Sequence, residues 1–297
     1  MGLEDKIWRI VELDKQDGYF NTALDEALLG LIESGITPPS IVFTQWKPTI
    51  SVGRTQDVLL DVDMDVTRSY GIDVLRRKSG GQAVYLDEGY IVFSILGTKN
   101  YFSEDWSRLR QSVCLVVKDA LNHFGIPADF TKPDNVVIYD NFLKTIGNSG
   151  QIIKQRSMGL HCGIRYDFLD YQRMIDSLKI NGVKLNPYSQ DIRNHLTCIK
   201  EYCKNVGKKQ IMDYLVHAFV HAFGGNSFYE DLTAFEIGRI QALASDQYCS
   251  DEWNIYDPTM KKSKGICYLF VNGKNIVPSL EPLLPYNKPS GLVEAMM

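Results

Sequence analysis

Two adjacent arginines followed by a glycine pair form the part of the chain best suited to bind an anion. The segment runs from Arg76 to Asp87 and reads Arg-Arg-Lys-Ser-Gly-Gly-Gln-Ala-Val-Tyr-Leu-Asp. Guanidinium groups form paired hydrogen bonds with phosphate or carboxylate oxygens, and a turn without Cβ atoms exposes backbone N–H groups to the same ligand. Since a glycine pair beside charged residues is also common in ordinary hairpin turns, the segment alone leaves anion binding and a simple turn both open.

A lysine in a second hairpin could supply a catalytic cation. The residues from Asp134 to Ile146 predict two strands joined by a turn at Asp140 and Asn141. Lys144 is the only charged residue of the return strand, and a run of small residues follows it. By itself this pattern also fits a solvent-facing lysine on an edge strand.

Together the two segments resemble the lipoate–protein ligase A family, within the wider group of biotin and lipoate attachment enzymes. That family carries Arg-Arg-x-Ser/Thr-Gly-Gly-Gly-x-Val-x-His-Asp, which the segment from Arg76 to Asp87 matches, and Lys-x-x-Gly-Ser/Asn-Ala, which the segment beginning at Lys144 matches. Three supporting segments stand in family order at residues 21–28, 45–56 and 250–254. The resemblance therefore covers about residues 5 to 255.

The chain departs from the family pattern at three places. Gln82 replaces the third glycine, as in the related octanoyltransferases, and Leu86 replaces the family histidine. Where ligases usually show His-Gly or His-His-Gly, this chain has Leu-His-Cys-Gly, with His161 followed by Cys162. The departures leave the group unchanged but keep its exact chemistry open.

The resemblance implies an ATP-dependent lipoate–protein ligase. ATP, with Mg²⁺, would activate lipoate or octanoate as the acyl adenylate, and a lysine of a lipoyl carrier domain would then accept the acyl group. The carriers would be the 2-oxoacid dehydrogenase E2 protein or the glycine cleavage H protein. Lys144 would stabilise the charge that grows between the acyl carbonyl and the α-phosphate.

The same resemblance implies which residues bind substrate and ATP. Asp134 could bind Mg²⁺ or only form a turn, and apolar side chains around Val84 and Ile146 would line the acyl tunnel. No resident metal site is predicted. The full set of implied binding residues is Arg76, Arg77, Ser79, Gly80, Gly81, Gln82, Val84, Asp87, Asp134, Gly147, Asn148 and His161.

Two alternatives remain. Octanoyltransferases use no ATP and pass the acyl chain through a cysteine thioester. One such group has its cysteine where this chain has Met158, and the other has it within 126–143, where this chain has none. Cys162 is the one thiol near the site, and a buried structural thiol is the competing interpretation. The second alternative is a non-catalytic acyl-carrier-binding homologue.

The replacement of the third glycine by Gln82 and of the family histidine by Leu86 favours this non-catalytic homologue. The retained Arg77, Asp87 and Lys144 argue against it. The ligase is the preferred interpretation.

Composition predicts a soluble cytoplasmic protein. The 297 residues are 44% hydrophobic, enough for one large core. The net charge of −4 gives no sign of a nucleic-acid-binding face, and no apolar run is long enough to cross a membrane. Six scattered cysteines favour reduced thiols over a disulfide framework.

The elements that must position these residues indicate an α+β fold, a mixed sheet covered by helices. Strands are expected at 7–13, 41–45, 49–52, 72–75, 83–85, 90–96 and 161–165, and helices at 21–32, 105–123, 210–223 and 232–245, with Asp105 as a cap. Residues 1–256 would form the biotin/lipoate ligase-like catalytic domain. Residues 257–297 would form a short C-terminal extension with a hairpin at 266–271 and 274–277, and a separate accessory chain would complete the enzyme.

Overall fold

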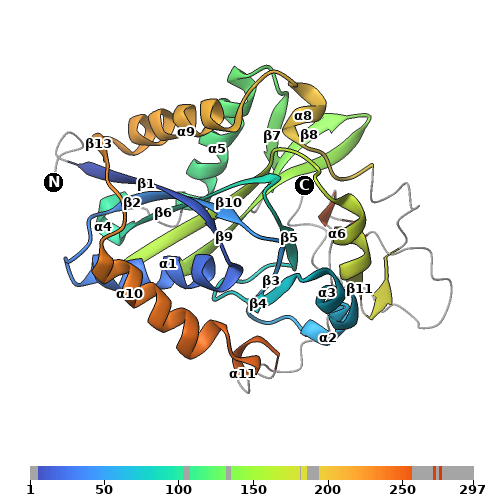
Figure 1. Cartoon of the computed structure of the whole chain (residues 1–297). Helices are drawn as coiled ribbons and strands as arrows, with labels where there is room; N and C mark the ends of the chain where they lie inside the picture. The colour runs from blue at the N-terminus through green and yellow to red at the C-terminus, as the bar shows by residue number, and fades with distance from the viewer. Residues whose placement is uncertain are drawn as a thin grey trace, which may run out of the picture.

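An eight-stranded mixed sheet forms the centre of the molecule (Figure 1). The structure is a computed structural model, and it describes residues 6–102, 108–131, 135–180, 182–185, 194–255, 270–271 and 274–275. Strand β1 pairs in parallel with β2 and β13, and all other neighbours are antiparallel. In spatial order the strands are β13 (Asn226–Tyr229), β1 (Ile7–Gln16), β2 (Ser40–Trp46), β6 (Tyr90–Thr98), β10 (Ser157–Arg165), β9 (Phe142–Ile153), β8 (Asn135–Asp140) and β7 (Ala128–Thr131).

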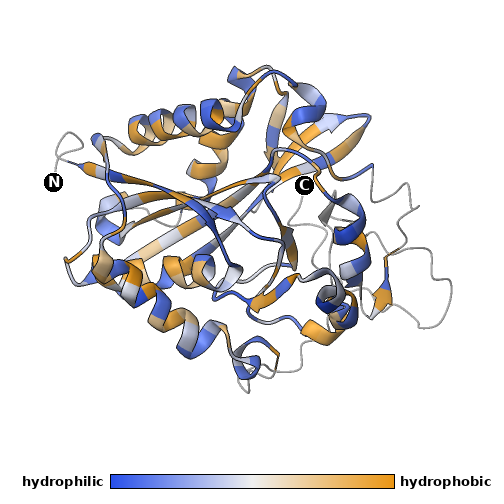
Figure 2. Ribbon diagram, in the orientation of Figure 1, coloured by the Kyte–Doolittle hydropathy of each residue, from blue (hydrophilic) through white to orange (hydrophobic). Residues whose placement is uncertain are grey.

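Helices cover both faces of this sheet because its buried strands present apolar side chains alternately to either side. On β2, Ile41 and Phe43 join the core beneath α5 (Leu109–His123) and α9 (Lys208–Phe223). Val42, between them, joins the opposite core beneath α1 (Gly18–Glu33) and α10 (Ala234–Leu243). These helices carry both hydrophobic and hydrophilic residues (Figure 2), as expected for helices with one buried face.

A second, three-stranded sheet carries the arginine–glycine segment. Strand β3 (Thr49–Val52) lies in its middle, parallel to β4 (Asp73–Arg76) and antiparallel to β5 (Val84–Leu86). Because β4 and β5 flank β3 on opposite sides, residues 77–83 form a crossing loop. The alternative of an ordinary hairpin turn is therefore wrong.

Short elements complete the described fold. Those around the small sheet are α2 (Val58–Asp61), α3 (Met64–Tyr70) and α6 (Tyr171–Ser177), and their apolar residues share a core with β3. The others are α4 (Lys99–Phe102), α8 (Ile199–Tyr202), α11 (Asp251–Asn254), the π-helical turn η3 (Ala244–Tyr248), and the pairs β11 (Lys179–Ile180) with β12 (Val183–Lys184) and β14 (Phe270–Val271) with β15 (Lys274–Asn275).

The α+β class and most of the expected elements are confirmed. The first helix begins earlier than predicted, at Gly18, because the Asp17 carboxylate accepts a hydrogen bond from the Phe20 N–H and caps it. The expected cap Asp105 lies outside the described residues. In the extension, β14 pairs with β15 as the hairpin prediction required, whereas the domain boundary at residue 256 stays a prediction. Within the described ranges, no helix combines the length and apolar character needed to cross a membrane.

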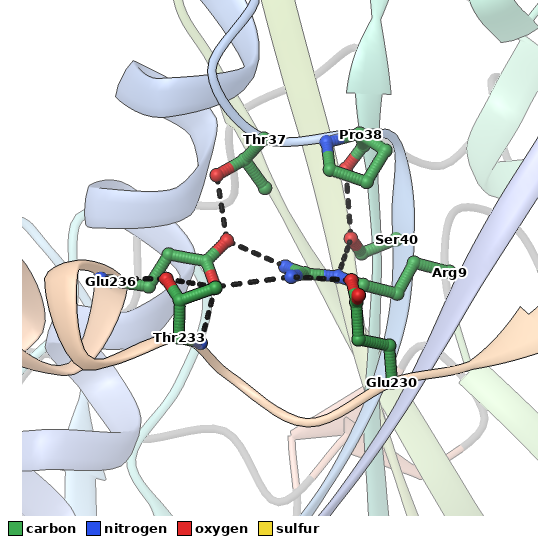
Figure 3. A network of polar contacts seen from close by, with 7 residues as sticks. All are labelled: Arg9, Thr37, Pro38, Ser40, Glu230, Thr233 and Glu236. Atoms are coloured by element: carbon green, nitrogen blue, oxygen red, sulfur yellow. Dashed lines mark hydrogen bonds and ion pairs between the residues drawn. The ribbon is translucent and has the colours of Figure 1, made fainter.

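A buried ion pair joins α10 to the central sheet (Figure 3). The Arg9 guanidinium of β1 donates to both carboxylate oxygens of Glu236, at 3.0 and 2.8 Å. The Thr37 hydroxyl donates to the same carboxylate at 2.7 Å, and Glu236 also completes a capping box with Thr233. Burial tends to raise the pKa of Glu236, but these hydrogen bonds outweigh burial and lower it to about 2.

This ion pair should make the fold acid-sensitive in a defined range. Because the pKa of Glu236 is lower in the folded chain, its contribution to stability is complete above about pH 4.5 and is lost as the pH falls towards about 2. The free energy of unfolding of the native chain should therefore fall more steeply over this range than that of Glu236→Gln. Urea titrations at several pH values test this, and parallel curves for the two proteins would contradict it.

Candidate functional site

The loop of residues 77–83 lies against the turn that follows β3. The Arg54 N–H donates to the Ser79 carbonyl at 2.9 Å, and the Arg77 N–H donates to the Val52 carbonyl at 2.9 Å. A Cβ atom at Gly53 would overlap the carbonyl oxygen of Gly81, so only glycine permits this approach. Gly80 and Gly81 are exposed, and Gly81 has a φ of 93°. The loop is thus fixed from behind and open on the other side.

Arg76 holds this arrangement together instead of contacting a ligand. Its side chain is completely buried, and its guanidinium donates to the carbonyls of Gly53, Gln56 and Asn254 at 3.1, 2.8 and 2.9 Å. The prediction that Arg76 binds substrate is corrected on this point: a guanidinium enclosed by main-chain oxygens cannot reach a ligand. Arg76 instead joins the turn after β3 to α11, the element formed by the supporting segment 250–254.

Arg77 braces the glycine loop. Its guanidinium donates to the Ser51 carbonyl at 2.6 Å, to the Gly80 and Gln82 carbonyls at 2.8 and 2.7 Å, and to the Ser79 hydroxyl at 3.1 Å. Burial lowers the pKa of Arg77 to about 10, so the guanidinium stays charged at neutral pH. Its clearest task is to fix the loop's shape, while direct ligand contact stays a prediction.

His161 lies between a carboxylate and a hydroxyl. Its Nδ1 is 3.2 Å from Asp25 Oδ2 of α1, and its Nε2 is 3.0 Å from Ser79 Oγ. Since the carboxylate only accepts, Nδ1 carries the proton and Nε2 accepts from the serine. Gly150, opposite His161 on β9, leaves the room for this pair, because a Cβ there would overlap His161 Nε2.

This order of carboxylate, imidazole and hydroxyl matches that of serine hydrolases, but Ser79 is only 2% exposed. Its hydroxyl also accepts a hydrogen bond from Arg77 Nε. The chain of hydrogen bonds therefore positions the loop against β10 and does not supply an exposed nucleophile. Asp25 had no assigned role in the sequence, although it lies in a segment that matched the family.

Lys144 lies on the same strand as Gly150, about 20 Å away at roughly 3.3 Å per residue. Its Nζ is 3.2 Å from Asp140 Oδ2, and the Tyr202 hydroxyl donates to that same oxygen at 3.3 Å. Burial lowers the pKa of Lys144, but the hydrogen bond with Asp140 and the negative charge of that carboxylate outweigh burial and raise it above its ordinary value. Lys144 is therefore a fixed ammonium ion at neutral pH.

The remaining predicted residues have varied surroundings. Gly147 packs tightly against β10, since a Cβ would lie 2.9 Å from the Gly163 carbonyl oxygen, and Asn148 follows it half-buried on β9. Val84 packs beside the apolar cluster that contains Leu86. The other two are Asp87, which accepts from the Gly89 N–H at 2.8 Å and whose pKa is raised by burial, and Asp134, which lies outside the described residues.

The described side chains do not form a resident metal site. Among residues that the structure places, no group of three His, Cys, Asp or Glu side chains could hold a metal ion.

Cys162 is a core residue. It is 2% exposed and packs in the cluster beneath α5 and α9, whereas its neighbour His161 points to Asp25. Burial, and then the nearby Cys114, raise the pKa of the Cys162 thiol well above its ordinary value. A thiol that is enclosed and protonated cannot act as a nucleophile.

A polar chain that the sequence did not reveal leads from the interior to the glycine loop. Gln56 donates from Nε2 to Asp61 Oδ2 at 2.7 Å and to Gln82 Oε1 at 3.2 Å. Asp61 is completely buried, and among the described residues its Oδ1 has no hydrogen-bond partner. Burial raises the pKa of Asp61 to about 6, against the hydrogen bond from Gln56.

Asp61 should make stability fall as the pH rises. Because its pKa is higher in the folded chain, its favourable contribution is complete below about pH 4 and is lost as the pH rises through about 6. Between about pH 5 and pH 7.5, the native chain should lose on the order of 1 kcal/mol more than Asp61→Asn, which cannot ionise. Urea unfolding at the two pH values measures this difference, and equal losses would refute it.

The chain matches the family model described as the lipoyl protein ligase A/B catalytic domain over residues 17–220. It is 33% identical to the octanoyltransferase LipM of Lysinibacillus sphaericus, with 83% of this chain and 98% of that protein covered. It is 26% identical to the probable lipoate-protein ligase A of Mycoplasma pneumoniae, with 82% and 70% covered.

Two solved structures share the fold. One is described as a bi-partite lipoate protein ligase and its E2 lipoyl domain from Thermoplasma acidophilum, with a TM-score of 0.71, 20% identity, and coverage of 85% of this chain and 96% of that one. The other is a lipoate-protein ligase A bound with ATP, with a TM-score of 0.68, 20% identity, and coverage of 83% and 98%.

Proposed function

Since the chain belongs to the lipoyl protein ligase A/B catalytic-domain family, we propose that it is an ATP-dependent lipoate–protein ligase. It would activate lipoate, or octanoate, as the acyl adenylate and transfer the acyl group to a lysine of a lipoyl carrier domain. The sequence relatives of this chain include an octanoyltransferase and a probable lipoate-protein ligase, so the family contains both kinds of enzyme. The choice between the two chemistries rests on the site.

The observation that carries the ligase proposal is the state of the cysteine nearest the site. A thioester route needs a thiolate that meets the acyl donor. Cys162 is enclosed in the core, its pKa is raised, and it lies on the face of β10 away from Asp25. The two positions at which octanoyltransferases carry their cysteine hold none in this chain. The ligase route needs a cation instead, and Lys144 supplies it.

The reaction would proceed in two displacements. The lipoate carboxylate attacks the α-phosphorus of ATP, so that a carboxyl–phosphate bond forms and pyrophosphate leaves. The neutral amine of the carrier lysine then attacks the acyl carbonyl, AMP leaves with the electron pair, and the nitrogen loses one proton to solvent as the amide forms. Both transition states gather negative charge at the carbonyl and α-phosphate oxygens, where the Lys144 ammonium would stabilise it. To do so, Lys144 must turn from Asp140, which holds it at 3.2 Å.

The exposed backbone of the glycine loop supports the binding half of this proposal. Arg77 and the turn after β3 fix the loop, so the N–H groups of Gly80 and Gly81 need no reordering when a ligand arrives. The carriers would be the E2 and H proteins. The likeness to a bi-partite ligase favours a separate accessory chain that helps to close the site.

The proposal is tested with purified protein, apo carrier domain, ATP–Mg²⁺ and either lipoate or octanoate. Mass spectrometry should show one acyl group added to the carrier, with pyrophosphate released, and no addition when ATP is omitted. Transfer from an octanoyl-carrier protein without ATP would establish the thioester route instead. Binding of the carrier without acyl transfer, even from chemically made lipoyl adenylate, would favour the non-catalytic homologue. If the protein transfers the acyl group from supplied lipoyl adenylate but not from lipoate and ATP, a separate accessory chain is needed for adenylate formation.

A further inference from the structure

Lys144 shares one side of the β8–β9 hairpin with a carboxylate and an exposed aromatic ring. In this hairpin Asp140 lies opposite Phe142, and Lys144 follows Phe142 by two residues. Side chains two residues apart on a strand, and side chains directly opposite each other, point to the same side. Asp140, Phe142 and Lys144 therefore form one surface, which we call the Lys144 face. Tyr139, one residue before Asp140, points to the other side of the hairpin.

The aromatic ring of the Lys144 face is held in place although it is exposed. Phe142 is 46% exposed, and its ring meets the His195 ring edge-on, with the ring centres 6.1 Å apart. The backbone of His195 is fixed in turn, because its carbonyl accepts a hydrogen bond from the Thr145 N–H at 2.9 Å. An aromatic ring that is already ordered loses little conformational freedom when a partner covers it. Such rings are enriched where proteins bind other proteins.

The charges beside this ring favour a cation as its occupant. The hairpin lies next to α8 (Figure 1), where the Tyr202 hydroxyl donates to Asp140. Asp140 is 45% exposed, and Glu201 of α8 is also exposed. Both carboxylates lie close enough to Lys144 to raise its pKa, after the hydrogen bond with Asp140. Two carboxylates against one ammonium ion leave negative charge in excess at these three groups, which attracts a cation from solution.

The excess grows during the proposed reaction. Lys144 must turn from Asp140 to reach the acyl carbonyl and the α-phosphate, and Asp140 then loses the ion pair that holds it at 3.2 Å. The partly exposed carboxylate is left open to a second ammonium ion. In the transfer step such an ion arrives, because the acceptor is a lysine of the carrier domain.

We propose that the Lys144 face binds the acceptor lysine of the carrier domain, and that it does so once the acyl adenylate occupies Lys144. The inference rests on the proposed function, which brings a lysine amine to the carbonyl beside Lys144. The acceptor lysine arrives as an ammonium ion and gives one proton to water, and its neutral amine donates a hydrogen bond to Asp140. The carboxylate orients the amine and stabilises the positive charge that grows on the nitrogen during attack.

The bonds made and broken are those of the second displacement. Asp140 touches the reacting amine and is a catalytic residue of the transfer step alone. Phe142 packs against the carrier surface around the acceptor lysine, so it contributes to docking.

Binding measurements test the order of events. Isothermal titration gives the affinity of the full chain for apo carrier domain, with and without an acyl-sulfamoyl adenosine that mimics the adenylate and cannot react. Because this analogue should draw Lys144 away from Asp140, we expect it to tighten carrier binding at least about fivefold. Asp140→Asn keeps the shape of the side chain without its charge and should show no tightening. Equal affinities of the native chain with and without the analogue would contradict the inference.

Kinetic measurements test the residues. The rate of transfer from chemically made lipoyl adenylate is followed against the concentration of carrier. Asp140→Asn should lower kcat/KM for the carrier at least about ten times more than it weakens binding of the analogue. Phe142→Ser should raise the KM for the carrier at least about fivefold with little change in kcat. Tyr139→Ser is the matched control, since this ring is 76% exposed on the other side of the same hairpin, and it should transfer normally.

The outcomes separate this inference from the proposed function. If Asp140→Asn weakens the analogue as much as it slows transfer, Asp140 acts only by holding Lys144, and the inference is wrong. If Phe142→Ser and Tyr139→Ser have the same KM for the carrier, the carrier docks elsewhere and the inference is again wrong. In both cases a native chain that acylates the carrier from the adenylate leaves the proposed function standing. A native chain that transfers no acyl group overturns both.

Discussion

Replacing Lys144 with alanine should lower the rate of carrier acylation by at least about a hundredfold while leaving the fold intact. This is the loss typical of removing one preorganised donor from a developing negative charge. Two observations lead to this expectation: Lys144 is the only charged residue of β9, and its raised pKa keeps it an ammonium ion. The side chain is only half-buried and contributes a single ion pair with the partly exposed Asp140, so stability should change little.

The measurement is the rate of acyl addition to the carrier under saturating ATP and lipoate, with circular dichroism as the test of folding. Lys204→Ala is the matched control, since Lys204 is an exposed lysine outside the site. A folded Lys144→Ala protein with near-native rates would exclude the catalytic role. Chemically made lipoyl adenylate separates the steps: because both transition states need the cation, transfer from the adenylate should also be slow.

Asp140 gives this prediction a further consequence. Its carboxylate holds Lys144 and accepts from Tyr202, so the lysine is positioned before any ligand binds. A substrate oxygen must then compete with a carboxylate that already pairs with the ammonium. The contact with Asp140 therefore positions the ammonium group but must be broken before Lys144 can pair with the substrate. The free energy needed to break it is small because Asp140 is partly exposed and water screens the ion pair.

The local elements could be predicted from the sequence because short-range patterns determine them. The apolar run at Ile41, Val42 and Phe43 predicts a strand, which β2 confirms, and its side chains join the clusters on both faces of the sheet. The predicted hairpin that contains Lys144 is also confirmed, since β8 pairs with β9 through a turn in which Asn141 takes a φ of 52°. The crossing of residues 77–83 over β3 was not predictable, because strand order depends on pairing between distant segments.

The same limit explains the corrections at the site. A pair of arginines shows that guanidinium groups are present, but not what faces them. Arg76 is satisfied by the carbonyl of Asn254, far away in the chain, and no local pattern could reveal that contact. His161 likewise obtains its partner Asp25 from the first helix. The family motif predicts that this loop binds a ligand, and tertiary contacts that no local pattern reveals divide its residues into those that shape the loop and those that are exposed.

Gly53→Ala should be among the most damaging single-methyl changes in the chain. The added Cβ would overlap the carbonyl oxygen of Gly81, a backbone atom that cannot rotate away. Relief requires the turn after β3 to separate from the glycine loop, which would disturb the Gly53 carbonyl bond to Arg76 and the Gly53 N–H bond to Gln56. We expect a loss of about 3 kcal/mol in the free energy of unfolding.

The matched control is Gly80→Ala, in the same loop, where an added Cβ would meet nothing within 4 Å. It should unfold at nearly the native urea concentration, so the contrast isolates the contact between Gly53 and Gly81 from a general effect of glycine replacement. At temperatures where Gly53→Ala is still folded, its loop is displaced, and its affinity for lipoate or ATP should fall as well. Equal stability of the two variants would show that the turn after β3 does not hold the loop, and the account of how Arg76 and Arg77 shape this site would fail with it.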